Sequence, residues 1–338
     1  MTGIGMEMMN LNTEPSKSAM ALTHPKHPAP PPPRVSLAGR PTIAFCFLTL
    51  SDVHHADMWR DWFAEAPEPD MYAIFVHRTD AEPGNALESK GATLIEAQQP
   101  SREPKHGGFD IVRVHYALTK AAMAHSPIVT KIVFLSADCV PVQRFSAVYA
   151  ALTASPARGV LAWDTPNAGH ALRDGPALAA RRADYWPREL SWTWLVASQW
   201  SVLARHHAAA LVEHWVHVES TFEVPGTAGE PPTAACKVPD EHALVVLFAA
   251  LGLLDSFDRR PFMYVDWEGK EADNSCGIEE KRKYTHAPSS DGNSPHTFHA
   301  HEGGDFEQGL RCALACGALF MRKVCELGAF GRPWTWSH

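Results

Sequence analysis

The chain has no apolar run long enough to cross a bilayer, since no window approaches the roughly 18 to 20 apolar residues that a membrane-spanning helix needs. Its N-terminus also lacks the basic-then-apolar order of a secretory signal peptide. Positive charge is scarce, because 38 acidic residues outweigh 30 Lys and Arg and leave a formal net charge of −8. We therefore expect a soluble chain with no transmembrane segment and no nucleic-acid partner, since phosphate backbones bind to basic surfaces.

Paired cysteine spacing is also lacking. None of the seven cysteines belongs to a Cys-x-x-Cys pair, so a zinc framework is not expected, and the disulfide state stays open. Cys312 and Cys316 are expected to lie on two buried faces of one element. His296, His299 and His301 fall within six residues and could suggest zinc. That segment has no turn with a carboxylate, and a chain with 19 histidines will cluster some of them.

The composition is that of an ordinary globular protein, with 338 residues of which 45% are hydrophobic and 20% are charged. Residues 1–40 contain a stiff proline tract and no periodic pattern, so they are predicted to be a disordered leader. Residues 41–338 are predicted to form the folded domain.

Apolar runs alternate with helical patterns from residue 42 onward. Strands are predicted at residues 42–50, 72–77, 131–136 and 160–163, and helices at 56–63, 111–124 and 145–153. This alternation predicts an α/β fold, with a mainly parallel sheet and helices on both faces. Ligands of such sheets bind beyond the carboxyl ends of the strands, which places residues 49–55, 77–80 and 136–141 along one edge.

The second half of the chain is less regular, with a helix predicted at 202–215, a strand at 262–267 and a last element at 309–325. Between them, Asp240 and Glu241 open an apolar run that reads as a helix. The free N–H groups and the positive dipole end of a helix favour an ionised carboxylate, so Glu241 could accept a proton from a bound hydroxyl. Acidic residues are also ordinary in the first turn of helices that have no such role.

Eight short segments, in order, resemble the core-2/I-branching glycosyltransferases (glycosyltransferase family 14), especially their plant-type relatives; protein O-xylosyltransferases are kin. The segments are Ile43 to Thr49, Tyr72 to His77, Phe134 to Pro141, Ser198-Gln199-Trp200, Cys236 to His242, Val265-Asp266-Trp267, Pro295 to Phe298, and Leu319 to Lys323. The resemblance implies a GT-A-like fold and transfer of a sugar from a UDP-sugar with inversion. It also implies that no divalent metal is needed.

The resemblance implies catalytic and donor-binding roles for particular residues. Glu241 would be the catalytic base, with Asp240 capping or orienting, although Asp240 could itself be the base. Lys323, with Arg322 beside it, would neutralise the donor diphosphate, although a lysine at such a place is by default a solvated surface cation. No Asp-x-Asp segment, the usual metal holder of GT-A enzymes, follows an early strand, and Asp138 stands alone there as a candidate substrate ligand. Departing UDP develops negative charge, so fixed cations would have to replace the ion.

Four further residues are candidates for substrate binding. His77 ends a buried strand at the edge where nucleotides dock, but Arg78 follows it here where many relatives carry an acid. Trp200 could wall a sugar ring or simply fill the core, and Ser198 opens the same motif. Asp266 could fix a loop near the donor or merely end a strand.

The expected function is metal-independent, inverting transfer of a sugar, such as N-acetylglucosamine or xylose, from a UDP-sugar to a glycan or protein hydroxyl, with no cofactor. A catalytically silent glycan- or nucleotide-binding module on the same fold is the alternative, and a histidine-dependent metal hydrolase is a third class. The resemblance further implies a Golgi membrane protein with an N-terminal anchor. No such anchor is seen in this sequence, so the compartment stays open.

Overall fold

The computed structural model describes the chain from residue 40 to residue 326, with gaps. The described residues are 40–49, 52–78, 87, 91–96, 109–164, 195–224, 233–236, 238–265, 298–299, 305–322 and 324–326. The predicted leader at residues 1–40 lies outside them, apart from Arg40. Among the helices within these ranges, none has both the length and the apolar character that crossing a membrane requires.

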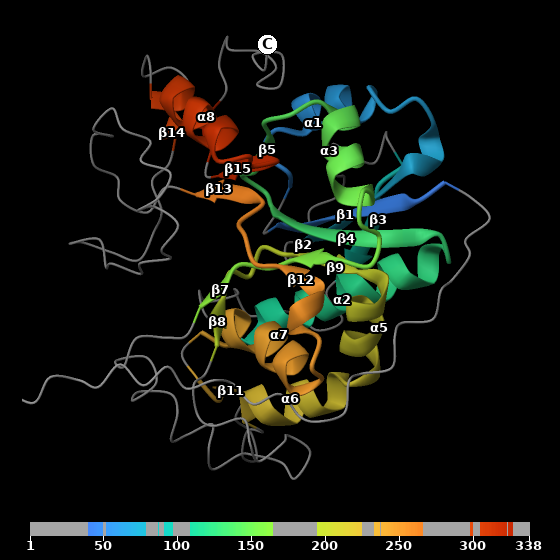
Figure 1. Cartoon of the computed structure of the whole chain (residues 1–338), viewed down its shortest axis with the longest axis vertical. Helices are drawn as coiled ribbons and strands as arrows, with labels where there is room; N and C mark the ends of the chain where they lie inside the picture. Colours follow the sequence, from blue (N-terminus) through green and yellow to red (C-terminus); the bar gives the residue numbers. More distant parts are fainter. Residues whose placement is uncertain are drawn as a thin grey trace, which may run out of the picture.

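A seven-stranded sheet forms the centre of the molecule (Figure 1). In spatial order the strands are β12 Phe257–Asp258, β6 Gly159–Val160, β9 Val202–Ala204, β4 Val129–Ser136, β1 Thr42–Thr49, β2 Tyr72–Arg78 and β3 Thr93–Glu96. Strands β4, β1, β2 and β3 run parallel, as do β6 and β12. Only β9 runs antiparallel to its neighbours β4 and β6 in this described sheet. The prediction of a mainly parallel sheet is confirmed.

Strand β1 shows why the sheet is buried on both faces. Its sequence is almost entirely apolar, which is typical of a strand covered on each side. Phe45 and Phe47 point toward helix α1 (Ala56–Phe63), where their ring centres lie 5.5 Å from Trp62 and 5.0 Å from Trp59. Side chains alternate along a strand, so Cys46 points to the opposite face. Full burial of each such phenylalanine contributes about 1.5–3 kcal/mol.

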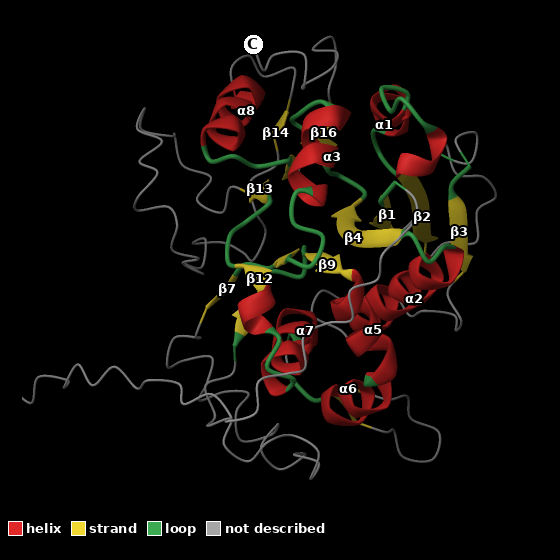
Figure 2. Ribbon diagram, turned by 45° about the vertical axis from the view of Figure 1, so that its right-hand side comes forward, coloured by secondary structure: helices red, strands yellow, loops and turns green. Residues whose placement is uncertain are grey.

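Helices cover both faces of the sheet (Figures 1 and 2). Helix α1 lies on one face with α3 Phe145–Thr153, and α2 Phe109–His125 and α5 Arg205–Glu213 pack on the other, with α6 Trp215–Phe222 and α7 Pro239–Ala250 beyond them. The α/β fold class, with a mainly parallel sheet between two helical layers, is therefore confirmed. The helices predicted at 56–63 and 145–153 match α1 and α3 at both ends.

A smaller sheet brings the end of the described chain back to its middle. It joins β13 Met263–Val265, β15 Phe320–Arg322 and β5 Val140–Pro141, with β15 parallel to β13 and antiparallel to β5. The remaining described elements are the strand pairs β7 Trp163–Asp164 with β8 Val196–Ala197, β10 Glu223–Val224 with β11 Thr233–Ala234 and β14 Phe298–His299 with β16 Val324–Glu326, the helix α8 Asp305–Ala315, and the short 3-10 helices Pro69–Met71 and Leu254–Ser256. Because β5 directly follows the carboxyl end of β4, this small sheet lies against the edge where ligands were expected.

The helix predicted at residues 202–215 was wrong at its start. Val202, Leu203 and Ala204 form strand β9, which pairs with residues 131–133 of β4, and all three residues are fully buried. The helix begins only at Arg205 and ends at Glu213. Three consecutive apolar residues before a helix are compatible with the helical or the strand repeat. Pairing with β4 makes this segment a strand. The strand predicted at 160–163 is likewise divided between β6 and β7.

The single last element predicted at 309–325 was also wrong. Helix α8 ends at Ala315, and strands β15 and β16 follow. Gly317 has a φ of 71°, and the bonds from Gly317 N to Leu314 O and from Ala318 N to Ala313 O close the helix as a Schellman motif. Cys312 is buried and disulfide-bonded, whereas Cys316 is exposed and free, so the expectation that both are buried fails.

Candidate functional site

Three segments that are distant in sequence meet at the carboxyl edge of the sheet. His54 N donates to Ala137 O at 3.0 Å, which joins the turn after β1 to the turn after β4. Val324 N donates to Asp138 O at 3.0 Å, and the His55 ring donates from Nε2 to Val324 O at 2.8 Å. These bonds confirm the predicted edge for residues 52–55 and 136–141. Residues 79–80, which were expected beside them, lie outside the described residues.

Arg322, Asp138 and Trp200 come together at this edge. Arg322 ends β15 and is only 9% exposed. Its Nε lies 3.7 Å from Asp138 Oδ1, and its Cζ lies 4.7 Å from the centre of the Trp200 ring. All three were candidates from the sequence, and the structure makes them one cluster.

The Arg322 guanidinium keeps hydrogen-bonding capacity in this cluster. The 3.7 Å separation from Asp138 is too long for a hydrogen bond. Within the described part of the chain, the buried Nε of Arg322 has no hydrogen-bond partner. Asp138 is held from the other side, because its Oδ1 accepts a hydrogen bond from the Ser136 hydroxyl. A buried cation with an unused donor is suited to receive an anion.

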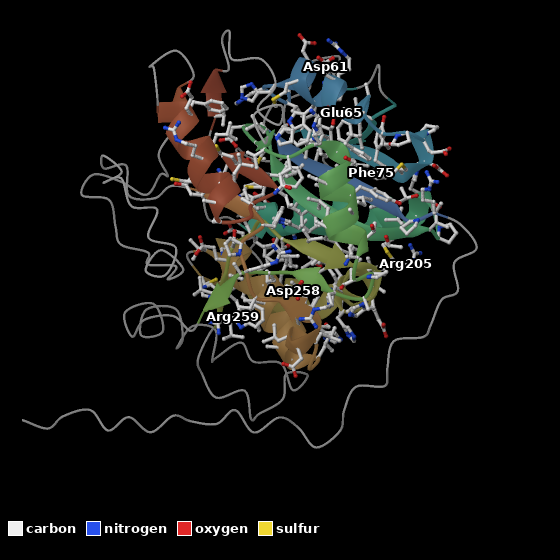
Figure 3. The ribbon with its side chains drawn as sticks, turned by 45° about the horizontal axis from the view of Figure 1, so that its top comes forward. Asp61, Glu65, Phe75, Arg205, Asp258 and Arg259 are labelled. Atoms are coloured by element: carbon white, nitrogen blue, oxygen red, sulfur yellow. The ribbon has the colours of Figure 1, made fainter. Side chains whose placement is uncertain are left out.

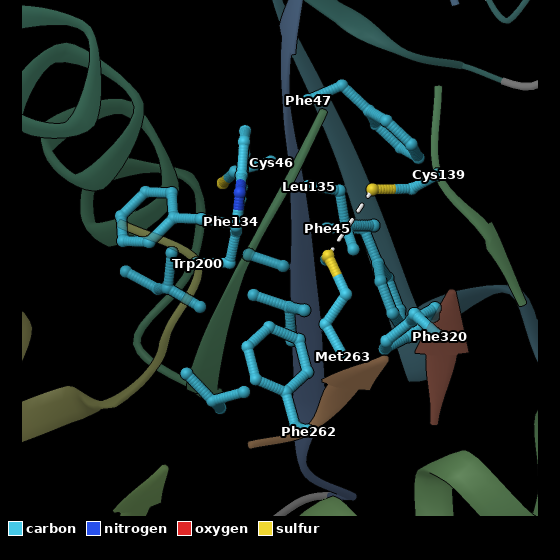
Figure 4. Close-up of a cluster of buried hydrophobic side chains, with 14 of the residues drawn as sticks. Phe45, Cys46, Phe47, Phe134, Leu135, Cys139, Trp200, Phe262, Met263 and Phe320 are labelled. Atoms are coloured by element: carbon cyan, nitrogen blue, oxygen red, sulfur yellow. Dashed lines mark hydrogen bonds between the residues drawn. The ribbon is translucent and has the colours of Figure 1, made fainter. Parts of the chain in front are cut away.

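Trp200 is part of the core and also supports Arg322. The residue is 8% exposed and belongs to the buried cluster that includes Phe134 and Phe262 (Figure 4). Its backbone N–H donates to the Ser198 hydroxyl at 3.2 Å, so Ser198 shapes the turn that carries the tryptophan. The ring therefore fills the core while presenting a face to the guanidinium.

The acidic pair lies in the first turn of α7. Pro239 occupies an N-terminal position of the helix, and Val238 before it provides no side-chain cap. Asp240 is 8% exposed, and among the described residues its Oδ1 has no hydrogen-bond partner. Burial, followed by the charge of Glu241, raises the pKa of Asp240 to about 7. Burial likewise raises the pKa of Glu241 to about 7.

The expectation that the helix end favours ionised carboxylates here was therefore wrong in its net direction. Helix α7 is apolar on nearly all sides and is buried among other elements. Loss of hydration disfavours the charged form of both acids more than the helix end favours it. Both acids consequently hold a proton at higher pH than an ordinary surface carboxyl does.

One segment connects the acidic helix to the arginine cluster. The His242 ring contacts Leu195 O through Nδ1 at 3.0 Å. Leu195 precedes β8, which packs beside α7, and the segment then reaches Trp200 five positions along the chain from Leu195. The residues 195–200 thus contact the start of α7 at one end and Arg322 at the other.

Among the described residues, His77 is not brought into this cluster. His77 lies inside β2, 4% exposed, between the register neighbours Leu48 and Ile95, and burial lowers its pKa. Among the described contacts, none joins it to Arg322, Asp138 or Trp200. Lys323 and Asp266 lie outside the residues for which the structure gives a description.

The structure does not describe the histidine group at residues 296–301 well enough to test it as a metal site. His296 and His301 lie outside the described residues, and only the strand position of His299 is known. Elsewhere in the described ranges, no group of three or more His, Cys, Asp or Glu side chains is arranged to hold a metal ion.

A second arginine–tryptophan pair lies elsewhere on the molecule. Arg259 donates from Nε to Trp163 O at 2.7 Å, and its Cζ lies 5.2 Å from that ring. In Figure 3, Arg259 and Asp258 are labelled in the lower half of the molecule, and Asp61 on α1 is labelled at its top. Arg259 is exposed, so water weakens its attraction to an anion more than it does at the buried Arg322.

Sequence reasoning missed two supporting residues at the edge. Ser136 supplies a hydroxyl to Asp138, and His55 ties the turn after β1 to Val324. Both fall within the ranges predicted for the edge, so their position in the sheet was the available signal. What the sequence did not show is which partner each would meet.

Comparison with known proteins supports the predicted family. The family model described as Branch: Core-2/I-Branching enzyme matches residues 43–294. Glycosyltransferase BC10 of Oryza sativa subsp. japonica is 26% identical over 263 residues, an alignment that covers 71% of this chain and 60% of that protein. The chain thus spans less than two thirds of the length of this relative.

Solved structures give a much weaker likeness. Glucosyl-3-phosphoglycerate synthase from Mycobacterium tuberculosis, in complex with Mn2+, UDP and glucosyl-3-phosphoglycerate, has 16% identity and a TM-score of 0.32, with 65% of this chain and 69% of that chain covered. The same synthase with Mn2+, UDP and phosphoglyceric acid has 17% identity and a TM-score of 0.32, with 65% and 68% covered. The family model, in contrast, matches most of the chain, and the chain therefore belongs to the Core-2/I-branching enzyme family.

Proposed function

We propose that the chain is a glycosyltransferase that moves a sugar from a UDP-sugar to a hydroxyl of a glycan or protein, with inversion and without a divalent metal. Family membership supports the reaction class. The observation that carries the proposal is the buried guanidinium of Arg322, which keeps an unused donor at the carboxyl edge of the sheet.

Arg322 is proposed to bind the diphosphate of the donor. A guanidinium presents donors in a planar fork that matches phosphate oxygens. Its attraction to an anion is stronger at a buried site than in water. As the bond to the sugar breaks, negative charge grows on the departing UDP, and a fixed cation stabilises that charge without reorganising. Lys323, the next residue, is proposed as a second cation.

Asp138 is proposed to orient Arg322 before the donor arrives. Its carboxylate lies near the guanidinium without a direct hydrogen bond and is itself held by Ser136. The pair keeps the cation at the edge while leaving donors for a ligand. Trp200 supports the guanidinium from a further side.

Glu241 is proposed as the base. It takes the proton of the acceptor hydroxyl as the acceptor oxygen bonds to the anomeric carbon and the bond from that carbon to UDP breaks on the opposite side. Attack opposite the leaving group inverts the anomeric centre. A base with a pKa of about 7 is well matched to work near neutral pH. Asp240 is proposed to cap or orient the first turn of α7 beside this base.

The test is release of UDP from a set of donors in the presence of EDTA. Purified protein is incubated with UDP-N-acetylglucosamine, UDP-xylose, UDP-glucuronate or UDP-glucose and with candidate acceptors. Turnover of one donor in EDTA supports the proposal, and turnover that requires an added divalent ion refutes metal independence. UDP binding by calorimetry without turnover of any donor would instead identify the silent binding module.

A further inference from the structure

His115 lies in the middle of α2, where its ring is enclosed by three parts of the fold. The residue is 1% exposed. Its Nε2 lies 3.1 Å from Gln199 O, and its Nδ1 lies 2.9 Å from Ile111 O, one helical turn earlier. The ring also packs edge-on against Phe134 of β4, with centres 4.5 Å apart at 80°. The imidazole thus joins α2 to the turn that precedes Trp200.

Of the two carbonyl oxygens that the ring contacts, only Gln199 O depends on His115 for a hydrogen-bond donor. Ile111 O is four residues before His115 in the same helix, so the backbone N–H of the helix already serves it. Gln199 O belongs to a turn between β8 and β9, outside the described strand pairs. A neutral imidazole has one N–H, and burial lowers the pKa of His115 to about 4. We assign that proton to Nε2, so that the ring donates to Gln199 O while Nδ1 faces Ile111 O without a hydrogen bond.

The peptide group between Gln199 and Trp200 is held at both of its polar atoms. Its C=O accepts from His115, and its N–H donates to the Ser198 hydroxyl at 3.2 Å. A peptide group is planar, so two opposed bonds fix its rotation. That rotation sets the direction of the Trp200 side chain, whose ring lies 4.7 Å from the guanidinium carbon of Arg322.

We propose that His115 is a positioning residue for the donor-binding cation, acting through the Gln199–Trp200 peptide to hold the Trp200 ring against Arg322. The proposal rests on the proposed role of Arg322 in binding the diphosphate. Without the His115 donor, the Gln199 carbonyl turns toward another partner, Trp200 shifts, and Arg322 loses the ring that supports it. His115 touches neither donor nor acceptor in this account.

The test compares UDP affinity and thermal stability in matched variants. His115→Phe keeps an aromatic ring beside Phe134 but removes the donor, and is expected to weaken UDP binding roughly tenfold. His115→Gln keeps an N–H donor and is expected to restore most of that affinity. The control is His207→Phe, which changes another fully buried histidine, one that contacts Ser256 at 2.7 Å and stacks on Phe257. It is expected to lower Tm and leave UDP affinity unchanged.

A double-mutant cycle separates positioning from general loss of structure. If His115 acts through Trp200, the effect of His115→Phe on UDP affinity disappears in a Trp200→Leu background, whereas its effect on Tm persists. An undiminished effect in that background would overturn the proposal, as would normal UDP affinity in His115→Phe. Where His115→Phe does not fold, Ser198→Ala releases the other end of the same peptide and must weaken UDP binding several-fold.

Failure of the broader function gives a different pattern. If wild-type protein does not bind UDP, or if Arg322→Gln binds it normally, the diphosphate role of Arg322 is wrong and the role of His115 falls with it. If Arg322→Gln loses affinity while His115→Phe does not, only the role of His115 is wrong.

Discussion

The guanidinium carbon of Arg322 lies 4.7 Å from the centre of the Trp200 ring, although 122 positions of sequence (322 − 200) separate the two residues. Asp138 completes the contact from a third part of the chain, at 3.7 Å from Nε. A charged group is expensive to bury unless it is compensated. Here one carboxylate and one aromatic face provide partial compensation, and the unused donor leaves room for an anionic ligand.

Replacing Arg322 should weaken binding of UDP. Arg322→Gln removes the charge and is expected to reduce affinity roughly 10- to 100-fold, the range for lost hydrogen bonds to charged groups. Arg322→Lys keeps the charge without the planar fork and should fall between that variant and wild type. Titration calorimetry with UDP measures both. Arg259→Gln is the control, because Arg259 also lies over a tryptophan but is exposed. Equal losses in Arg259→Gln and Arg322→Gln would point to overall charge instead of a site.

Replacing Glu241 should remove turnover while leaving donor binding intact. Glu241→Gln is expected to lower kcat about 10²- to 10⁴-fold, the usual contribution of a general base, with UDP affinity unchanged. The wild-type rate should rise with pH through about 7, because only the ionised carboxylate accepts a proton and burial raises its pKa to that value. Steady-state rates between pH 5.5 and about 8.5 check both points. A wild-type rate in Glu241→Gln would exclude this residue as the base.

Replacing Asp240 should make folding stability less sensitive to pH. Its pKa is raised by burial from 3.8 to about 7, so the folded state holds the proton more tightly than the unfolded state does. Wild-type stability is therefore lost as pH rises from about 4 to about 7. Asp240→Asn does not titrate and is expected to gain stability relative to wild type at about pH 8, by on the order of 1–4 kcal/mol, but not at about pH 4.

Urea unfolding at these two pH values measures the effect. Asp57→Asn is the matched control, because the Asp57 side chain is 85% exposed in its ion pair with Arg60. Its difference from wild type should stay within about 0.5 kcal/mol at both pH values. A gain in Asp240→Asn that is the same at both pH values would contradict the assigned pKa direction.

Adding one methyl group at Gly159 should destabilise the central sheet. A Cβ there would lie 2.5 Å from Phe257 Cδ1 and 2.7 Å from the backbone oxygen of Val202. Backbone of a neighbouring strand has little freedom to move, so Gly159→Ala is expected to cost about 1–3 kcal/mol as overpacking. Thermal unfolding measures this loss as a fall in Tm relative to wild type. An unchanged Tm in Gly159→Ala would show that β6 and β12 can separate readily.

The strands and helices of the first half could be predicted because local pattern and tertiary environment agree there. The apolar run of β1 has no competing interpretation, and α1 and α3 begin and end at the predicted residues. The local pattern does not determine the structure where a short apolar segment is compatible with both a helix and a strand. Val202–Ala204 became a strand because β4 offered unpaired backbone beside it, which is a property of the assembled sheet.

The candidate site was predictable as a set of residues but not as an arrangement. Arg322 and Asp138 were each identified through short motifs, but their contact depends on the pairing of Phe320 with Pro141 and of Met321 with Val140. No local pattern encodes a pairing across such a separation. The acidic pair shows the converse, because a correct local argument about the helix end was outweighed by the burial of α7.

The pairing of β15 with β5 also fixes when the cation site can exist during synthesis. Strands β1, β2 and β4 are complete once residue 136 has been made, whereas Arg322 is added 186 residues later (322 − 136). A partly synthesised chain can therefore form the parallel half of the sheet with its Asp138 turn empty of its basic partner. If Arg322 binds the donor as proposed, donor binding requires synthesis past β15. A product truncated ahead of Phe320 would also lose a fully buried ring that packs against Phe45 and Trp59.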